Sequence, residues 1–583
     1  MFGPLTINEL PLSLSFTRRK VENFLISQGL RPEPLDRYFG ISDPDGNLIG
    51  GGGLQGNVVK CIALSEATRG ESVSNSLVSR IAEAAREEGH DFLFIFTKPE
   101  NEGIFGSLAF RTVGRAAKAI LMENNPRGIS SYTDRLRKIA ASVGGEKRGV
   151  IVMNCNPLTK GHRYLIETAA SQVDHLFIIP VMEGDSEYSY DERVAMIEAA
   201  TVGIANVTVC PGSAYSVSKA TFPTYFLKDL NDASKTHIDL DLDIFSTHVA
   251  PALGASVRFV GTEPTDALTE EYNARMKRSL PERGIEIVEV DRLCQSDAPV
   301  SASRVRKLTD GFRAGEALPL VSPVSVPWVL AHAAARSLEA ELALTPKPGL
   351  VDMADSGSHT DMDFELMQSS IRSLTPYFAR LASLGTDSLP SHDDIVRLGI
   401  EAEKAMLAAT GGVNTHRGAL FSLGLTLIAA SRLFMKEGRI EASALQSSIS
   451  ALAEGFGSDS DSHGSEARRK YGLKGASDLA REGYDTLFAD WLPFYRSKRH
   501  LSEARHLLLL RIMSEIDDTN VYHRGGAEGA AYVKEEARKL LDGWTEAGMA
   551  DANRKFIERN LSPGGAADML ALTLLVDSLC GNI

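Results

Sequence analysis

The sequence predicts a multidomain protein in three parts: α+β over residues 1–135, α/β over 146–320 and all-α over 325–583. Three observations lead to this prediction. The chain of 583 residues is too long for a single hydrophobic core. Strand and helix patterns alternate as far as residue 320, and strand patterns vanish beyond residue 325. Between these regions lies the Pro/Ser/Val-rich "LPLVSPVSVP", residues 318–327, which predicts a linker.

The composition excludes two classes of protein. The net charge of −14 gives no general attraction to nucleic acid or anionic lipid. The longest uncharged apolar stretches, such as 423–430, are too short to span a bilayer. The five cysteines are scattered and form no CxxC motif, which favours reduced thiols. We therefore expect a cytoplasmic protein that has neither nucleic acid nor a membrane as a partner.

The first part alternates helix and strand patterns. Residues 21–29 and 74–88 read as helices, residues 38–64 as strands joined by an Asp-Pro-Asp-Gly turn, and "FLFIFT" as a further strand. The stretch "RGESVSNSLVSRIAEAAREEG" resembles the acyl-CoA-binding turn and helix of the GNAT acetyltransferases, and "IFGSLAF" resembles their late aromatic segment. Ser72 and Ser74 stand where that family usually has glycines. The resemblance thus implies a GNAT-like domain that is structural or docks a pantetheine arm.

The second part predicts a mainly parallel, Rossmann-like sheet with helices on both faces. Its strands read "GVIVM", "HLFIIPV", "NVTVC", "SVRFVG" and "IEIVEV", and helical patterns cover 191–201, 221–230 and 269–278. Ligands of such sheets bind at the carboxyl ends of the strands, where "NPLTKGH" (156–162) follows the first strand and opens a helix. The unpaired N–H groups of that helix start predict a phosphate site. A second helix start, "VSASRVRKL" (300–308), offers hydroxyls and arginines.

These two segments, in this order, resemble the paired signatures of the nucleotidylyltransferase superfamily. Attack on the α-phosphate of ATP builds charge on phosphoryl oxygens, so positioned donors and cations suffice for catalysis. The resemblance implies that His162 stabilises the α-phosphate and that Thr159 and Lys160 hold the phosphates. The remaining residues that it implies for binding or for gripping the departing pyrophosphate are Asn156, Gly161, Ser301, Ser303 and Arg306.

Residues 1–320 together resemble [citrate (pro-3S)-lyase] ligase. The resemblance is carried by "NCNPLTKGHRYLIETAA", "ATFPTYFLKDL" and "GTEPTDALTEEYNARM" behind the GNAT-like front. It implies that the chain adenylates acetate and passes the acetyl group to the prosthetic-group thiol on the citrate lyase acyl carrier protein. Residues that match its motifs are Lys228, with no assigned role, and Thr262, Glu263, Tyr272 and Asn273, which are expected to contact nucleotide or the pantetheine arm.

The third part predicts long amphipathic helices, such as 418–434 and 502–516, punctuated by polar segments. The segments "TPKPGLVD", "GSHTDMD", "GGVNTHRG", "DDTNVYHRGG" and "SPGGAAD" resemble, in order, those of the triphosphoribosyl-dephospho-CoA synthase family. That resemblance implies the joining of C1 of ATP's ribose to the 2′-hydroxyl of dephospho-CoA, with release of adenine. We expect the 457–475 stretch between these segments to be a surface loop.

The chemistry of that reaction assigns candidate roles within the five segments. It needs a base for the hydroxyl, charge relief for three phosphates and a donor to the adenine. His359 and His416 are the acid–base candidates. The candidate nucleotide-binding residues are Lys347, Asn414, Arg417, Asn520 and Arg524. Candidate oxygen ligands for Mg²⁺ are Asp352, Asp361, Asp517, Asp518 and Asp568, while Asp363 fits a helix cap equally well.

Two other functions stay open at this point. The α/β part could form a dinucleotide, as pantetheine-phosphate and NMN adenylyltransferases do, because "TKGH" alone does not separate these activities. The chain could also be a non-catalytic scaffold for assembling citrate lyase. A related carrier is a further alternative, because malonate decarboxylase uses a similar prosthetic group.

Overall fold

The structure is a computed structural model that describes residues 6–66, 71–182, 186–216, 230–262, 267–295, 298–387, 389–456 and 469–581. The chain divides into two compact units. We call the first, Met1–Asn156 with Gly161–Cys294, the α/β unit. The second, Pro157–Lys160 with Gln295–Ile583, is the helical unit. Each is described by itself below.

The α/β unit opens with a mixed sheet in the order β1-β2-β3-β4-β5-β7-β6. Neighbouring strands are antiparallel except β4 and β5, which are parallel and pair over only two residues. The strands are β1 (Ile7–Leu10), β2 (Arg37–Ser42), β3 (Leu48–Gln55), β4 (Val58–Leu64), β5 (Phe94–Thr97), β6 (Arg111–Arg115) and β7 (Ile120–Glu123). The predicted α+β class and the turn at Asp43–Gly46 are confirmed.

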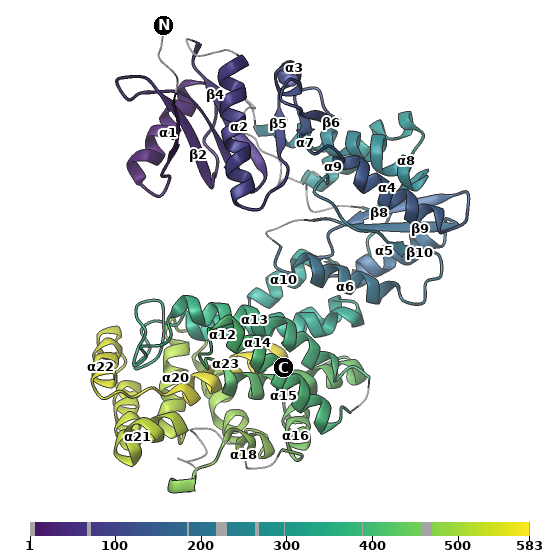
Figure 1. The fold of residues 1–583 in the computed structure, drawn as a ribbon. Helices are drawn as coiled ribbons and strands as arrows, with labels where there is room; N and C mark the ends of the chain where they lie inside the picture. Colours follow the sequence, from purple (N-terminus) through teal and green to yellow (C-terminus); the bar gives the residue numbers. More distant parts are fainter. Residues whose placement is uncertain are drawn as a thin grey trace. The chain divides into compact units, whose positions relative to one another are not determined.

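Helices cover both faces of this sheet (Figure 1). The helices are α1 (Ser15–Ser27), α2 (Glu71–Glu87), α3 (Glu102–Gly106) and α4 (Gly128–Ala141). Because successive side chains of a strand point to opposite faces, Tyr38 joins one core with Phe24 of α1, and Phe39 joins another with Ile81 of α2. The two predicted helices are confirmed, and the first begins earlier than the pattern indicated.

The second sheet of the α/β unit is parallel throughout, in the order β10-β9-β8-β11-β12. Its strands are β8 (Arg148–Met153), β9 (His175–Pro180), β10 (Val207–Val209), β11 (Val257–Gly261) and β12 (Glu286–Val290). The helices around it are α5 (Lys160–Ala170), α6 (Tyr190–Thr201), α7 (Leu230–Ile244), α8 (Ala250–Leu253) and α9 (Ala267–Ser279). All five predicted strands are confirmed, and so is the Rossmann-like class. The strand order reverses between β8 and β11, the point where such sheets bind ligands.

The two sheets of the α/β unit share one hydrophobic core. Val113 of β6 lies in the same cluster as Leu240 and Ile244 of α7. The Arg115 amide donates to Asp243 Oδ2 at 2.8 Å, and the Tyr215 hydroxyl donates to Glu123 Oε2 at 2.5 Å. The part with the mixed sheet and the part with the parallel sheet are therefore packed as one body. The predicted helix at 221–230, and with it Lys228, lies outside the described residues apart from Leu230.

The helical unit contains no strand among its described residues beyond Val321, as predicted. Its helices before the cavity segments are α10 (Ala302–Asp310), α11 (Ala314–Ala317) and α12 (Val326–Leu342). Those that follow are α13 (Phe364–Ser383), α14 (His392–Ala409), α15 (Arg417–Glu437), α16 (Ala442–Ala453), α18 (Ala476–Arg481), α19 (Leu492–Lys498), α20 (Ala504–Glu515), α21 (Thr519–Asp542), α22 (Glu546–Glu558) and α23 (Gly564–Cys580). Helices α12, α13, α15 and α23 pack on one another and form its centre (Figure 1).

The central helices are apolar around most of their circumference because neighbours surround them. Helix α15 shows this best. Among the described helices, it is the one with the length and mean hydropathy (1.6) of a membrane span, and 67% of that window is buried within the protein.

The prediction of a linker at 318–327 is wrong. Leu318, Leu320 and Val321 are buried, and the segment forms two short 3₁₀ turns, Leu318–Leu320 and Pro323–Ser325. Just before it, the Ala314 amide donates to Ser578 Oγ of α23 at 3.1 Å. The apolar residues that a linker would expose are instead packed against the helical unit. Pro319, at the second position of the first turn, and Pro323, at the first position of the second, mark helix starts rather than an extended chain.

We predict that Gly315→Ala destabilises the helical unit by about 1–3 kcal/mol through overpacking. A Cβ at Gly315 would lie 2.2 Å from the Leu579 carbonyl oxygen, which is backbone and cannot turn aside. The measurement is thermal unfolding followed by circular dichroism. Gly399→Ala in α14 is the matched control, because its Cβ would meet nothing within 4 Å. Equal melting temperatures for the two variants would contradict the packing of α11 on α23.

Candidate functional site

The first candidate site is the turn that follows β8 in the α/β unit. Arg193 of α6 is wholly buried and ties this turn to the end of β9. Its guanidinium donates to the carbonyls of Asn154 (3.0 Å), Val181 (2.7 Å) and Tyr188 (3.1 Å). The Tyr188 amide in turn donates to Asn156 Oδ1 at 3.0 Å. The carboxyl ends of β8 and β9 are thus fixed by one buried cation that sequence reasoning missed.

His162 lies in the first turn of α5, as predicted, and is half-buried. Burial, with a smaller effect from the positive charge of Arg292, lowers the pKa of His162 to about 4. The ring is therefore neutral at pH 7 and can offer one N–H as a hydrogen-bond donor. Arg292 is itself held at the end of β11, where its Nε donates to the Thr262 carbonyl at 2.7 Å.

The other residues matched to the ligase motifs support the strand ends. Asn273 donates to the Gly261 carbonyl at 3.0 Å, and the Tyr272 hydroxyl accepts from Arg258 at 3.1 Å. These contacts indicate that Tyr272 and Asn273 hold β11 in place. Glu263 lies outside the described residues.

The second phosphate motif lies in the helical unit, together with Thr159 and Lys160. Ser301 caps α10, because its hydroxyl accepts the Arg304 amide at 3.3 Å, and it lies 3.2 Å from the Ser303 hydroxyl. Thr159 is buried and pairs with Val321. The pairing of Ser301, Ser303 and Arg306 with His162 stays a prediction.

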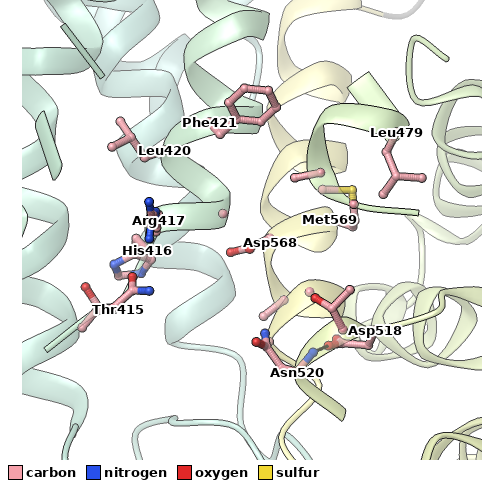
Figure 2. Close-up of a pocket in the computed structure, with 18 of the residues that line it drawn as sticks. Thr415, His416, Arg417, Leu420, Phe421, Leu479, Asp518, Asn520, Asp568 and Met569 are labelled. Atoms are coloured by element: carbon pink, nitrogen blue, oxygen red, sulfur yellow. Dashed lines mark hydrogen bonds between the residues drawn. The ribbon is translucent and has the colours of Figure 1, made fainter. Parts of the chain in front are cut away.

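The second candidate site is a cavity of about 2020 Å³ within the helical unit. Residues from all five polar segments line it, although these segments span more than 200 positions of the sequence. The predicted residues among the lining are Lys347, His359, Asp361, Asn414, His416, Arg417, Asp517, Asp518, Asn520, Arg524 and Asp568. Figure 2 shows Asp568 of α23 facing the start of α15, where His416 and Arg417 lie. The structure thus brings together nearly every candidate residue of this part.

Asp518 joins two helices at the cavity wall. Its Oδ1 accepts the amide of Asn520 at 2.9 Å at the start of α21, and its Oδ2 accepts the Ala566 amide at 3.0 Å at the start of α23. Burial raises the pKa of Asp518, and these backbone hydrogen bonds oppose that rise. The carboxylate is therefore stabilised by the positive ends of two helix dipoles.

Asp568 is the least compensated carboxyl group of the cavity. Burial, followed by the charges of Glu341 and Asp518, raises its pKa well above the ordinary 3.8, while a hydrogen bond from the Ala419 amide lowers it. Gly418 makes this approach to α15 possible, because a Cβ there would lie 2.1 Å from Asp568 Oδ2. A bound cation would relieve this repulsion.

Lys347 enters the cavity already paired. Its Nζ lies 2.5 Å from Glu341 Oε1, and both side chains are at most 5% exposed. A buried lysine requires such a partner because an isolated charge costs several kcal/mol. Sequence reasoning missed Glu341, since a glutamate inside a helical pattern gives no signal of its partner.

The two candidate histidines are each anchored by a hydroxyl. His359 Nε2 lies 2.8 Å from Ser562 Oγ, and Arg524 Nη2 lies 3.3 Å from His359 Nδ1. His416 Nδ1 lies 2.8 Å from Ser370 Oγ. Burial first, and a nearby positive charge second, lowers the pKa of both rings, that of His416 to about 4. Both are neutral at pH 7.

The remaining candidate carboxylates have other partners. Asp352 does not line the cavity, and its oxygens accept the amides of Lys347 (2.9 Å) and Ala354 (2.7 Å), so it closes a turn. Asp517 pairs with Lys534 at 2.7 Å. Asp363 caps α13 by accepting the Leu366 amide, which confirms that alternative. Among the described residues, no group of three or more His, Cys, Asp or Glu is placed to hold a metal ion.

Comparison with known proteins identifies both halves of the chain. The family described as "Citrate lyase ligase C-terminal domain" matches residues 148–328, and "ATP:dephospho-CoA triphosphoribosyl transferase" matches 327–582. The Klebsiella pneumoniae protein named [Citrate [pro-3S]-lyase] ligase is 42% identical over 296 residues, which cover 50% of this chain and 86% of that protein. This chain belongs to both families.

A relative of the helical part agrees with this assignment. An Azotobacter vinelandii protein named "Probable 2-(5''-triphosphoribosyl)-3'-dephosphocoenzyme-A synthase" is 39% identical over 254 residues, or 41% of this chain and 87% of its own length. Among solved structures, Escherichia coli ElaA covers 21% of this chain and 100% of its own, at 16% identity and a TM-score of 0.19. The two family resemblances inferred from the motifs are confirmed.

We predict that Asp568→Asn stabilises the helical unit at pH 7 by about 1–3 kcal/mol, because the amide needs no charge compensation. The amide oxygen can still accept the Ala419 N–H. Since the folded-state pKa of Asp568 is raised above 3.8, the native protein loses stability as the pH rises from 3.8 through the folded-state pKa. The gain of the variant should therefore vanish at and below pH 3.8.

The measurement is the melting temperature as a function of pH, in the presence of a chelator. Asp363→Asn is the matched control, since it makes the same change at an exposed helix cap where asparagine serves as well. A pH-independent difference between Asp568→Asn and the native protein would show that the Asp568 charge is not repelled in the folded state.

Proposed function

We propose that the chain is a bifunctional enzyme that makes and activates the prosthetic group of citrate lyase. The helical unit joins C1 of ATP's ribose to the 2′-hydroxyl of dephospho-CoA and releases adenine. The α/β unit, with the motif at 301–306, adenylates acetate with release of pyrophosphate. It then passes the acetyl group to the prosthetic-group thiol on the acyl carrier protein of citrate lyase, giving AMP. The two family matches support these assignments.

The observation that carries the synthase assignment is the single cavity of about 2020 Å³. Pockets for one small ligand usually measure about 300–1000 Å³, so this cavity has room for two nucleotides side by side. ATP and dephospho-CoA must both bind before the 2′-oxygen can reach the ribose. Arg417, Lys470 and Arg524 line the cavity as cations for the phosphates.

The acid–base work of the synthase falls to buried groups that are neutral or paired. His359 is oriented by Ser562 and Arg524, so the unprotonated nitrogen of its neutral ring can accept the proton of the attacking hydroxyl. Because the Arg524 guanidinium can only donate, Nδ1 is the unprotonated nitrogen of the neutral ring and Nε2–H faces Ser562 Oγ. Lys347 and Glu341 form an ion pair, which adds no net charge beside the substrates. Asn414 and Asn520 supply amide donors and acceptors for the nucleotide.

Mg²⁺ fits this cavity as a companion of the triphosphate. Mg²⁺ is usually held in proteins by one or two carboxylates plus substrate phosphates rather than by an all-protein cage, which agrees with the absence of a three-ligand cluster among the described residues. Asp568, with Asp518 beside it, is the carboxylate best placed to hold the ion, and Asp361 and Asp517 lie at the cavity lining as further candidates. When bound, the ion neutralises phosphate charge.

In the ligase reaction the protein's contribution is positioning and charge relief. We assign His162 to the α-phosphate, as a neutral N–H donor, and Thr159, Lys160, Ser301, Ser303 and Arg306 to the remaining phosphates. Arg193 keeps the phosphate turn in place through its three backbone carbonyl contacts. Five free cysteines agree with a reducing compartment, and we expect the cytoplasm.

We predict that the native protein releases adenine from ATP only when dephospho-CoA is present, and pyrophosphate only when acetate is present. Adenine is measured by chromatography and pyrophosphate by an enzyme-coupled assay. A dinucleotide product in place of acetate-dependent pyrophosphate would favour the adenylyltransferase alternative, and inactivity in both assays would favour a scaffold.

We predict that His162→Ala lowers acetate-dependent pyrophosphate release by about 10²–10³-fold, because a donor to developing phosphoryl charge is lost. Adenine release should be unchanged, since that reaction uses the helical unit. His90→Ala, a change of the same kind at a half-buried residue of the same unit, is the control. Native acetate activation in His162→Ala would remove this residue from the site.

We predict that Asp568→Asn nearly abolishes adenine release in a folded protein and raises the Mg²⁺ concentration needed for the remaining activity. The reason is the loss of the carboxylate that would share the ion with the triphosphate. A Mg²⁺ titration of adenine release gives both quantities, with Asp363→Asn as the control. Native turnover at ordinary Mg²⁺ would exclude Asp568 as a ligand of the ion. The triphosphate would then be bound by the cationic side chains of the cavity alone.

A further inference from the structure

The two ring nitrogens of His416, at the cavity wall, have different surroundings. Its side chain is 3% exposed and lines the cavity, and its Nε2 has no hydrogen-bond partner among the described residues. Its Nδ1 lies 2.8 Å from Ser370 Oγ. A buried polar atom without a partner destabilises the fold, so such an atom at a cavity wall points to a ligand that pairs with it.

The hydrogen bonds behind the ring decide which nitrogen carries the proton. The Thr415 hydroxyl donates to Ser370 Oγ at 2.7 Å. Ser370 has one hydroxyl proton, and among the described residues its only acceptor is His416 Nδ1. Because Nδ1 accepts, the proton of a neutral imidazole must sit on Nε2. The unpartnered atom is therefore an N–H donor.

We propose that Ser370 and Thr415 are positioning residues that fix His416 in its Nε2–H tautomer, so that it donates a hydrogen bond to the adenine departing from ATP. This inference rests on the proposed synthase function. It gives His416 the role of a fixed donor and leaves the proton of the attacking hydroxyl to another group. The low pKa of His416, about 4, agrees with a ring that stays neutral throughout.

The adenine is a better partner for this donor than a phosphate is. Phosphate oxygens carry full charges and are matched by the arginines and lysines that line the same cavity. A neutral N–H in a buried position suits an uncharged heterocycle whose ring nitrogens are acceptors. Leu420 and Phe421, one turn further along α15 from His416, also line the cavity and offer apolar surface to such a ring (Figure 2).

The step balances without any further reactant. The C1–N9 bond of ATP breaks and its electron pair goes to the adenine, while the 2′-oxygen of dephospho-CoA bonds to C1. The 2′-hydroxyl loses one proton and adenine gains one. A hydrogen bond from Nε2–H stabilises the negative charge that develops on the base in the transition state. The Nε2 proton itself stays on the histidine.

The first test reads the tautomer without any assay of activity. Full-length protein containing ¹⁵N-labelled histidine is examined by two-dimensional ¹H–¹⁵N NMR, with the His416 signals assigned from His416→Gln. We expect the Nε2–H tautomer in the native protein and a shift toward Nδ1–H in Ser370→Ala. The matched control is Ser373→Ala, on the same helix, whose hydroxyl donates to the Ser370 carbonyl at 2.8 Å. A native Nδ1–H tautomer would overturn the proposal.

The second test reads the role in catalysis. Removing one donor to transition-state charge should lower kcat for adenine release by about 10²–10³-fold in His416→Ala with little change in KM for ATP. His416→Gln places an amide N–H near the position of Nε2 and should retain most of kcat, whereas His416→Asn should behave like alanine. Ser370→Ala should lower kcat by about 10-fold and Ser373→Ala should not. A change confined to KM would indicate a phosphate contact and overturn the assignment to adenine.

A third measurement distinguishes donation to the adenine from the synthase function on which it rests. Inosine triphosphate carries a base that leaves with less assistance, so the loss in His416→Ala should be smaller with it than with ATP. An equal loss with both nucleotides would contradict donation to the base. If the native protein released no adenine at all, the proposed function would fail, while the NMR result would still establish or refute the tautomer.

Discussion

The helical unit depends on the stabilisation of buried carboxylates by the amide groups at helix N-termini. One carboxylate oxygen of Asp518 accepts an amide at the start of α21, and the other accepts an amide at the start of α23. Asp568 lies against Gly418 at the start of α15. Three helix N-termini thus converge on one cavity with their unpaired amides partly satisfied by carboxylates. The carboxylate of Asp568 remains under-compensated, because burial and the charges of Glu341 and Asp518 outweigh its one hydrogen bond from the Ala419 amide.

The cavity separates its charged and neutral donors. The arginines and lysines that line it carry full charges, whereas burial first and a nearby positive charge second lower the pKa of His359 and His416, so both rings are neutral at pH 7. The positive charge of the buried Lys347 is neutralised by its ion pair with Glu341. The cavity therefore offers different environments to charged groups and to uncharged groups.

The boundary between the two activities is not a linker. The two family matches meet at residues 327–328, yet the helical unit takes in residues from Gln295 onward together with Pro157–Lys160. Residues 302–325 pack as helices and turns against α23 and its neighbours. The motif at 301–306 thus belongs to the helical unit.

The sequence by itself determined the five parallel strands, the switch to an all-helical part, the two families and the segments that line the cavity. These follow from periodicity and from residue types at fixed spacing, which are local properties. Only the tertiary structure decided what each polar side chain does. Asp352 closes a turn, Asp518 caps two helices and Lys347 meets Glu341, while Ser370, silent inside a helical pattern, orients His416. The same aspartate can be a cap or a ligand, because its role depends on which donors other segments bring within hydrogen-bond distance, and that information is not local in the chain.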